Sequence, residues 1–138
     1  MRAGSYDCGN IIIQTDKPYY KSNEMITGKI YIRVTYPIQA TIVEIEVFGK
    51  ERGSWIDRNF EDDPIKRRGY RVIFQGITPV YRPPPEGLLP GDYEIPFEFK
   101  LPPNLPSSML FRNYDHFSNP RAMIKYIIRA RIRTGNLN

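Results

Sequence analysis

Residues 29–36 read KIYIRVTY, and apolar and polar side chains alternate along this stretch. On one face, an extended chain would carry the apolar set Ile30, Ile32, Val34 and Tyr36. A period of two is typical of a β-strand with one face in a core and the other in water. The stretch therefore predicts such a strand.

The same alternation recurs at residues 41–48, 93–101 and 124–132, and residues 10–15 and 70–77 predict two further, less regular strands. No segment keeps a helical period over three turns. Several strands with one wet face need a second sheet to cover their dry faces. The sequence therefore predicts an all-β fold, a two-sheet antiparallel β-sandwich, with 13 prolines and 10 glycines to supply its turns.

The length of 138 residues suits one domain with one core. Cys8 is the only cysteine, so no disulfide can form within the chain. The first 25 residues hold no apolar run of signal-peptide length, and no stretch approaches the ~20 apolar residues of a membrane span. These features favour a reducing, cytoplasmic location.

Charge is unevenly distributed along a chain whose net charge is +5. Residues 40–63 hold seven acidic and three basic side chains, a local sum of −4. Residues 64–82 hold five basic side chains and no acidic one, and so do residues 121–133. Segregated charge favours association with charged partners, but it does not distinguish protein, lipid and nucleic acid.

The last predicted strand carries a basic face that is a candidate anion-binding or partner-binding surface. Its members alternate on the wet side and are Lys125, Arg129, Arg131 and Arg133. Such side chains suit the carboxylates or phosphates of an acidic peptide, a phosphopeptide or an anionic lipid. The alternative is that they pair within the sheet. The carboxylates available for that pairing are Glu44, Glu46, Glu94 and Glu98.

The first predicted strand is a candidate partner-binding edge. Its central residues are Ile11, Ile12, Ile13 and Gln14, and the isoleucines make it apolar on both faces. At the edge of a sheet, such a strand exposes unpaired backbone that proteins normally cover. The cover would be the domain's own loops, a downstream segment, or a partner strand added by β-augmentation.

A second basic cluster consists of Lys66, Arg67 and Arg68 and is expected in or beside a loop. Binding of single-stranded nucleic acid needs exposed aromatic residues among the bases, whereas most aromatics here fall at core-facing positions. A solvated run of charge is therefore favoured over nucleic-acid contact. Residues 111–122 are expected to form a long loop with at most one helical turn.

Signals for an enzyme are weak in this sequence. His116 is the only histidine, and nothing in the spacing brings it to Cys8. One histidine and one cysteine are too few for a zinc site. No calcium loop, phosphate loop or nucleophile elbow occurs in the sequence. The sequence predicts no catalytic residue, no metal and no cofactor.

Two blocks of short motifs follow one another along nearly the whole chain. The first comprises Ile11–Gln14, Asp16-Lys17-Pro18-Tyr19, Glu24, Thr27-Gly28-Lys29-Ile30, and Pro37-Ile38 leading into Ile42–Gly49. The second comprises Leu89-Pro90-Gly91-Asp92-Tyr93-Glu94, Pro96–Phe99, Leu101-Pro102, Leu105–Ser108 and Ile124-Lys125-Tyr126. This ordered set, over about residues 10–133, resembles the N-terminal domain of the arrestin family. The paired lysines of visual and β-arrestins are replaced by Ile11–Gln14, so the sequence looks nearer to α-arrestins and arrestin-domain-containing proteins.

The resemblance implies an immunoglobulin-like sandwich of seven or eight strands that acts as a non-catalytic adaptor or scaffold. Implied partners are the cytoplasmic tails of membrane-protein cargo, trafficking, signalling or ubiquitin-ligase proteins, and the chain's own C-terminal arrestin-like domain. The implied organisation is an N-terminal extension at 1–9, the arrestin-like domain at 10–134, and the start of a linker at 135–138. The implied location is cytoplasmic, with peripheral contact to endosomal or plasma membranes.

Asn23 stands where the family has a turn glycine, and asparagine tolerates the left-handed backbone conformation.

Two other functions fit the same sequence. One is a retromer-type arrestin-like coat subunit, which would sit in a stable complex. The other is an anionic-ligand module that binds phospholipid or nucleic acid through Arg129, Arg131 and Arg133.

Overall fold

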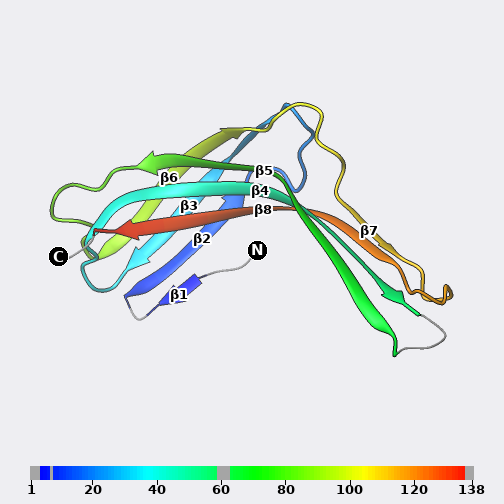
Figure 1. The fold of residues 1–138 in the computed structure, drawn as a ribbon. Coiled ribbons are helices and arrows are strands. Elements are labelled where there is room, and N and C mark those ends of the chain that lie inside the picture. Colours follow the sequence, from blue (N-terminus) through cyan, green and yellow to red (C-terminus); the bar gives the residue numbers. More distant parts are fainter. Residues whose placement is uncertain (1–3, 7, 59–62, 136–138) are drawn as a thin grey trace. The chain divides into compact units, whose positions relative to one another are not determined.

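A computed structural model describes residues 4–6, 8–58 and 63–135 of the chain. Within these ranges every helix-or-strand element is a strand, which confirms the predicted all-β class. The strands are β1 (Gly4–Tyr6), β2 (Gly9–Thr15), β3 (Met25–Val34), β4 (Ala40–Asp57), β5 (Ile65–Tyr81), β6 (Gly91–Lys100), β7 (Met109–Arg112) and β8 (Arg121–Thr134), as labelled in Figure 1.

The strands form two four-stranded sheets. One sheet has the order β1-β2-β3-β6, and the other has the order β5-β4-β8-β7. Each pairing whose register is described is antiparallel. The predicted two-sheet antiparallel sandwich is confirmed, and part of the segment predicted as an N-terminal extension forms β1.

Contacts divide the chain into two compact units. Unit 1 comprises Met1–Glu46, Ile77–Asn104 and Ile128–Asn138, and unit 2 comprises Val47–Gly76 and Leu105–Ile127. Strands β4, β5 and β8 therefore contribute one part to each unit, whereas β7 lies wholly in unit 2.

Unit 1 contains the core that the alternating pattern predicts. Ile30 and Ile32 of β3 are 0% and 3% exposed, and Ile30 lies opposite Ile95 of β6. Val43 and Ile45 of β4 supply fully buried side chains from the other sheet. Complete burial of one such side chain stabilises a fold by about 1.5–3 kcal/mol, so these residues hold the two layers together.

Unit 2 is built from longer strands than the sequence predicts. β4 continues to Asp57 instead of ending near 48, and β5 begins at Ile65 instead of 70. In the described part of unit 2 only Val47 and Gly49 are buried. Because most side chains on both faces reach water, these strand parts need no apolar alternation, and the sequence pattern misses them.

The loop predicted at residues 111–122 is wrong at both ends. β7 extends through Arg112, and β8 begins at Arg121, so only residues 113–120 connect the two strands. The two strands are paired along the whole length of β7, from Met109 opposite Ile124 to Arg112 opposite Arg121.

The turn between β2 and β3 is fixed by local polar contacts. Asn23 has a φ of 66°, which confirms that asparagine fills a left-handed position there. Lys17 Nζ lies 2.6 Å from Glu24 Oε2, and Thr27 Oγ1 donates a hydrogen bond of 2.6 Å to Asp16. These contacts join the two ends of the turn.

Candidate functional site

The basic face predicted on β8 is paired with buried carboxylates of β4 where it lies in unit 1. Arg131 and Arg133 lie 2.6 Å and 2.7 Å from Glu46 and Glu44, respectively, and Arg129 lies 3.5 Å from Glu46. Both glutamates are only 5% exposed. The structure therefore has the pairing arrangement, in which arginine stems cover the carboxylates of the central strand. Partner binding by this face stays a prediction.

Lys125, the fourth member of the predicted basic face, belongs to the part of β8 in unit 2. Its side chain is exposed. The structure thus assigns Lys125 and the three arginines of that face to different units.

The edge predicted at Ile11–Gln14 is partly covered by the chain itself. β2 lies between β1 and β3, and Ile11 is opposite Gly4 of β1. At Ile11 the cover is therefore a strand of the chain itself. Partner pairing at Ile12, Ile13 and Gln14 stays a prediction.

The second basic cluster lies in the first residues of β5 and thus beside the connection between β4 and β5, one of the two positions that the sequence predicts. Lys66, Arg67 and Arg68 belong to β5, so neighbouring side chains point to opposite faces of the sheet. Arg67 Nε lies 3.5 Å from the carboxylate of Asp57 on β4. Lys66 and Arg68 instead line a groove on the other face.

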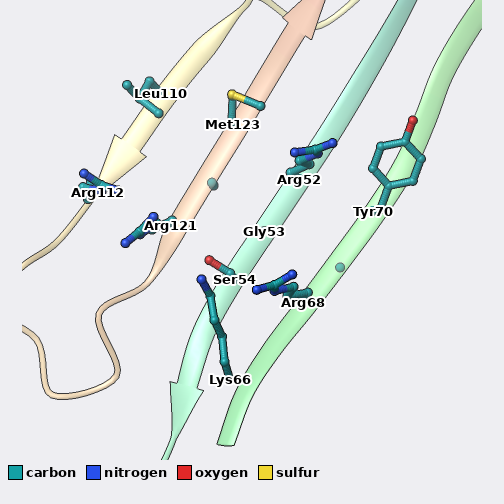
Figure 2. Close-up of a pocket in the computed structure, with 12 residues that line it drawn as sticks. Arg52, Gly53, Ser54, Lys66, Arg68, Tyr70, Leu110, Arg112, Arg121 and Met123 are labelled. Carbon is teal, nitrogen blue, oxygen red and sulfur yellow. The ribbon is translucent and has the colours of Figure 1, made fainter.

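This groove is the candidate functional site, and it lies entirely within unit 2. It has a volume of about 610 Å³, and it is formed by side chains that project from one face of four adjacent strands, as Figure 2 shows. Among the described residues, five basic side chains and no acidic side chain line it. They are Arg112 of β7, Arg121 of β8, Arg52 of β4, and Lys66 and Arg68 of β5, and we call them the groove cations.

Two of the groove cations are direct neighbours across a strand pair. Arg112 lies opposite Arg121 in the β7–β8 register. The backbone N–H of Asn113 donates to the carbonyl of Pro120, and this bond sets the parity of the ladder. Arg112 and Arg121 are therefore a non-hydrogen-bonded pair, the type in which opposing side chains come closest. Like charges at such positions repel each other.

Aromatic and apolar groups separate the charges of the groove. The guanidinium of Arg52 lies 5.7 Å from the ring centre of Tyr70, and that of Arg112 lies 4.8 Å from the ring centre of Tyr114 and donates to its hydroxyl. Leu110 and Met123 line the groove beside the arginines. Stacking on a ring orders a guanidinium and leaves most of its N–H donors available.

The opposite face of the same strands has balanced charge. Arg71 lies 2.8 Å from Glu51, and Arg67 pairs with Asp57. Among the described residues, by contrast, no carboxylate forms an ion pair with a groove cation. In the part of unit 2 that the structure describes, the groove therefore gathers positive charge without a paired carboxylate and is suited to bind an acidic group.

Sequence reasoning identified Lys66 and Arg68 but missed Arg52, Arg112 and Arg121 as members of one site. These arginines are isolated in the sequence, and only the strand order and register bring them together. The available signal was the alternation of Lys66, Arg68 and Tyr70 on one face of an extended segment.

Cys8 and His116 belong to different units. Cys8 is half-buried, and His116 Nδ1 lies 2.6 Å from Ser118 Oγ while its ring stacks on Phe117. Within the ranges that the structure describes, no group of three or more His, Cys, Asp or Glu side chains is placed to hold a metal ion. In the same ranges, no helix has the length and apolar character needed to cross a membrane.

Comparisons with known proteins place the chain in a family. No curated protein sequence matches it. Its fold is similar to a solved structure of Spo0M, the sporulation control protein from Bacillus subtilis, with a TM-score of 0.45, 12% identity, and coverage of 93% of this chain and 48% of that one. The chain thus spans about half the length of that protein.

The sequence profile described as "Arrestin (or S-antigen), N-terminal domain" matches residues 9–136. The nearer likeness to α-arrestins stays a prediction. Because the match covers almost the entire sequence, the chain belongs to the arrestin family, as an N-terminal domain.

Proposed function

We propose that this chain is a non-catalytic adaptor domain that binds extended segments of partner proteins along the outer edge of β7. The observation that carries the proposal is the exposure of this edge strand. β7 is the last strand in the order β5-β4-β8-β7, and its apolar residues Met109, Leu110 and Phe111 are 44%, 80% and 48% exposed. An exposed apolar edge strand is a ready template for another strand.

The backbone of β7 offers hydrogen bonds in the outward direction. The bond from Asn113 N–H to Pro120 makes Asn113 a hydrogen-bonded partner of β8. By alternation, Phe111 and Met109 also bond to β8, whereas the N–H and C=O groups of Leu110 and Arg112 point away from it. A partner strand would bond to these two residues.

Two of the other sheet edges, β5 and β6, carry residues that oppose pairing. The unit 2 part of β5 carries consecutive charges at Lys66, Arg67 and Arg68. β6, one of the two edges of the other sheet, carries Pro96 among alternating acidic residues. Charges and proline are ordinary protections of sheet edges. β7 has only Arg112, at its end, so its edge is better suited to a partner than the edges of β5 and β6.

The partner class that we propose follows from the family. It comprises the cytoplasmic tails of membrane-protein cargo and the trafficking or signalling proteins that handle such cargo. An adaptor needs a surface on which short, extended segments of different proteins can pair through their backbones, and β-augmentation provides that kind of recognition.

The test begins with a phage-displayed library of random twelve-residue peptides, selected on the immobilised chain. The tightest-binding peptide is then synthesised. The hydrogen exchange of the amides of the ¹⁵N-labelled chain is measured with and without this peptide. We expect the amides of Leu110 and Arg112 to gain protection, while those of Met109 and Phe111, already bonded to β8, stay unchanged. A library without binders, or protection confined to other strands, would contradict the proposal.

A variant pair isolates the backbone contribution. Leu110→Pro removes the outward N–H, and Leu110→Ala removes the same apolar side chain but keeps the N–H. We expect Leu110→Pro to bind the peptide about tenfold more weakly than Leu110→Ala, because one hydrogen bond and its geometry are lost. Equal affinities in two variants whose amide spectra remain dispersed would count against edge pairing.

A further inference from the structure

We propose that the groove beside β7 selects partner segments that carry an acidic side chain opposite Arg112 and an apolar side chain opposite Leu110. This inference rests on the proposed function, because the segment is the one that pairs with β7. It adds a ligand class, an acidic and apolar extended peptide, and a spacing for its side chains.

The groove carries several positive charges close together. Its five cations gather on one sheet face without a described carboxylate, and Arg112 and Arg121 lie directly opposite each other. Elsewhere the described sheet faces neutralise their arginines, as with Arg33 and Asp92 at 3.0 Å, or Arg131 and Glu46 at 2.6 Å. No described carboxylate pairs with the groove cations, so an added carboxylate would relieve the repulsion there.

The groove lies beside the outer edge of β7, because two residues of β7 line it. Leu110 and Arg112 line the groove with their side chains, and the same two residues have outward-facing backbone groups. A strand bonded to them would place the side chains opposite them on the groove face. The residue between these two would lie on the other face, next to Phe111.

The direction in which a partner strand runs along β7 sets the order of the ligand's residues. All described pairings in this protein are antiparallel, and an antiparallel segment meets Arg112 before Leu110. The expected pattern, read from N- to C-terminus, is acidic, apolar, apolar. Arg121 stands behind Arg112 in the same row, so the carboxylate can accept hydrogen bonds from both guanidinium groups.

The apolar members of the groove favour a peptide over a purely anionic ligand. Leu110 is 80% exposed and Tyr70 is 59% exposed, and both lie among the cations. A free phosphate or a nucleic-acid backbone would leave Leu110 in water. An anionic membrane would satisfy both kinds of side chain, so it is the competing occupant in the experiment.

The experiment uses three synthetic nine-residue peptides and fluorescence anisotropy at low salt. The first carries glutamate at the position opposite Arg112, the second carries glutamine there, and the third carries the glutamate one residue later. We expect the first to bind about tenfold more tightly than the other two. Equal binding of the glutamate and glutamine peptides would overturn the inference.

Variants locate the acidic contact. Arg112→Gln and Arg121→Gln should each remove most of the advantage of the glutamate peptide. Arg71→Gln is the matched control, because Arg71 lies on the opposite face of unit 2 and pairs with Glu51. It should keep the advantage. An advantage that survives Arg112→Gln and Arg121→Gln would place the acidic contact elsewhere and contradict the inference.

The outcomes separate this inference from the function on which it rests. If Leu110→Pro abolishes peptide binding but the glutamate and glutamine peptides bind equally, β7 is still the docking edge and acidic selection is refuted. Acidic selection with normal binding to Leu110→Pro would refute pairing with β7. Vesicles containing about one-fifth phosphatidylserine form the last arm, and binding to them that needs Arg112 and Arg121, without any peptide preference, would assign the groove to lipid instead.

Discussion

Glu46 is 5% exposed although a carboxylate is costly to bury, and its neighbours explain why it is tolerated. Arg131 lies 2.6 Å from one of its oxygens and Arg129 lies 3.5 Å from the other. When one partner of such an ion pair loses its charge, the other partner stays desolvated and unpaired. The arginine side chains are 39% and 55% exposed, so water reduces that cost.

We therefore expect Glu46→Gln to lower the free energy of unfolding by about 1–2 kcal/mol, less than for a fully buried pair. Urea unfolding followed by tryptophan fluorescence or circular dichroism measures it. The matched control is Glu94→Gln, whose carboxylate lies 2.6 Å from Lys29 but is 55% exposed. Its urea midpoint should not change measurably. A larger effect at Glu94 than at Glu46 would contradict this account of the β4–β8 pairing.

At the scale of the element, the β2–β3 turn makes a pH prediction. The hydrogen bond from Lys17 lowers the pKa of the Glu24 carboxyl below its usual value. A group with a lowered pKa in the folded state stabilises that state above its unfolded pKa, and the contribution is lost as the pH falls through the lowered value. The turn should therefore loosen only in acid.

A carboxyl titration by NMR tests that prediction. The Glu24 midpoint should lie below that of an ordinary glutamate, and it should return to the ordinary value in Lys17→Gln or at high salt, because the pair is exposed and screened. An unchanged Glu24 midpoint in Lys17→Gln would show that the lysine is not the cause.

Strands with one wet face are the elements that the sequence predicts well. β3 and β6 alternate because one side of each lies in the core of unit 1, as with Ile30 opposite Ile95. The parts of β4 and β5 in unit 2 have water on both sides, so selection for alternating hydrophobicity is absent. Local pattern therefore cannot reveal them.

The candidate site is predictable only in part for a related reason. Alternation on an extended chain places Lys66 and Arg68 on one face, which the sequence alone can give. Arg112 and Arg121 become neighbours only through the register of β7 on β8, and Arg52 joins them only through the strand order. Register and order are set by long-range contacts that a single sequence does not contain.

At the scale of the whole molecule, the two units differ in what stabilises them. Unit 1 holds the fully buried side chains of Ile30, Val43, Ile45 and Leu88. The described part of unit 2 buries Val47 and Gly49 alone and relies on sheet hydrogen bonds, exposed ion pairs and half-buried side chains. Segments with few buried apolar contacts open at lower free energy than the core does.

We therefore expect amides in β3 and β6 to exchange at least about 100-fold more slowly than amides in residues 65–76 and in β7, a difference of roughly 2.7 kcal/mol in opening free energy. Hydrogen–deuterium exchange read by mass spectrometry measures this. The variant Ile30→Val removes one buried methyl group, so protection in β3 and β6 should fall by about fivefold to tenfold. Amides of unit 2 that exchange by local opening should keep their rates in this variant. Equal protection in the two units, or an equal loss in both, would mean that the chain opens as one cooperative structure and that the groove is as rigid as the core.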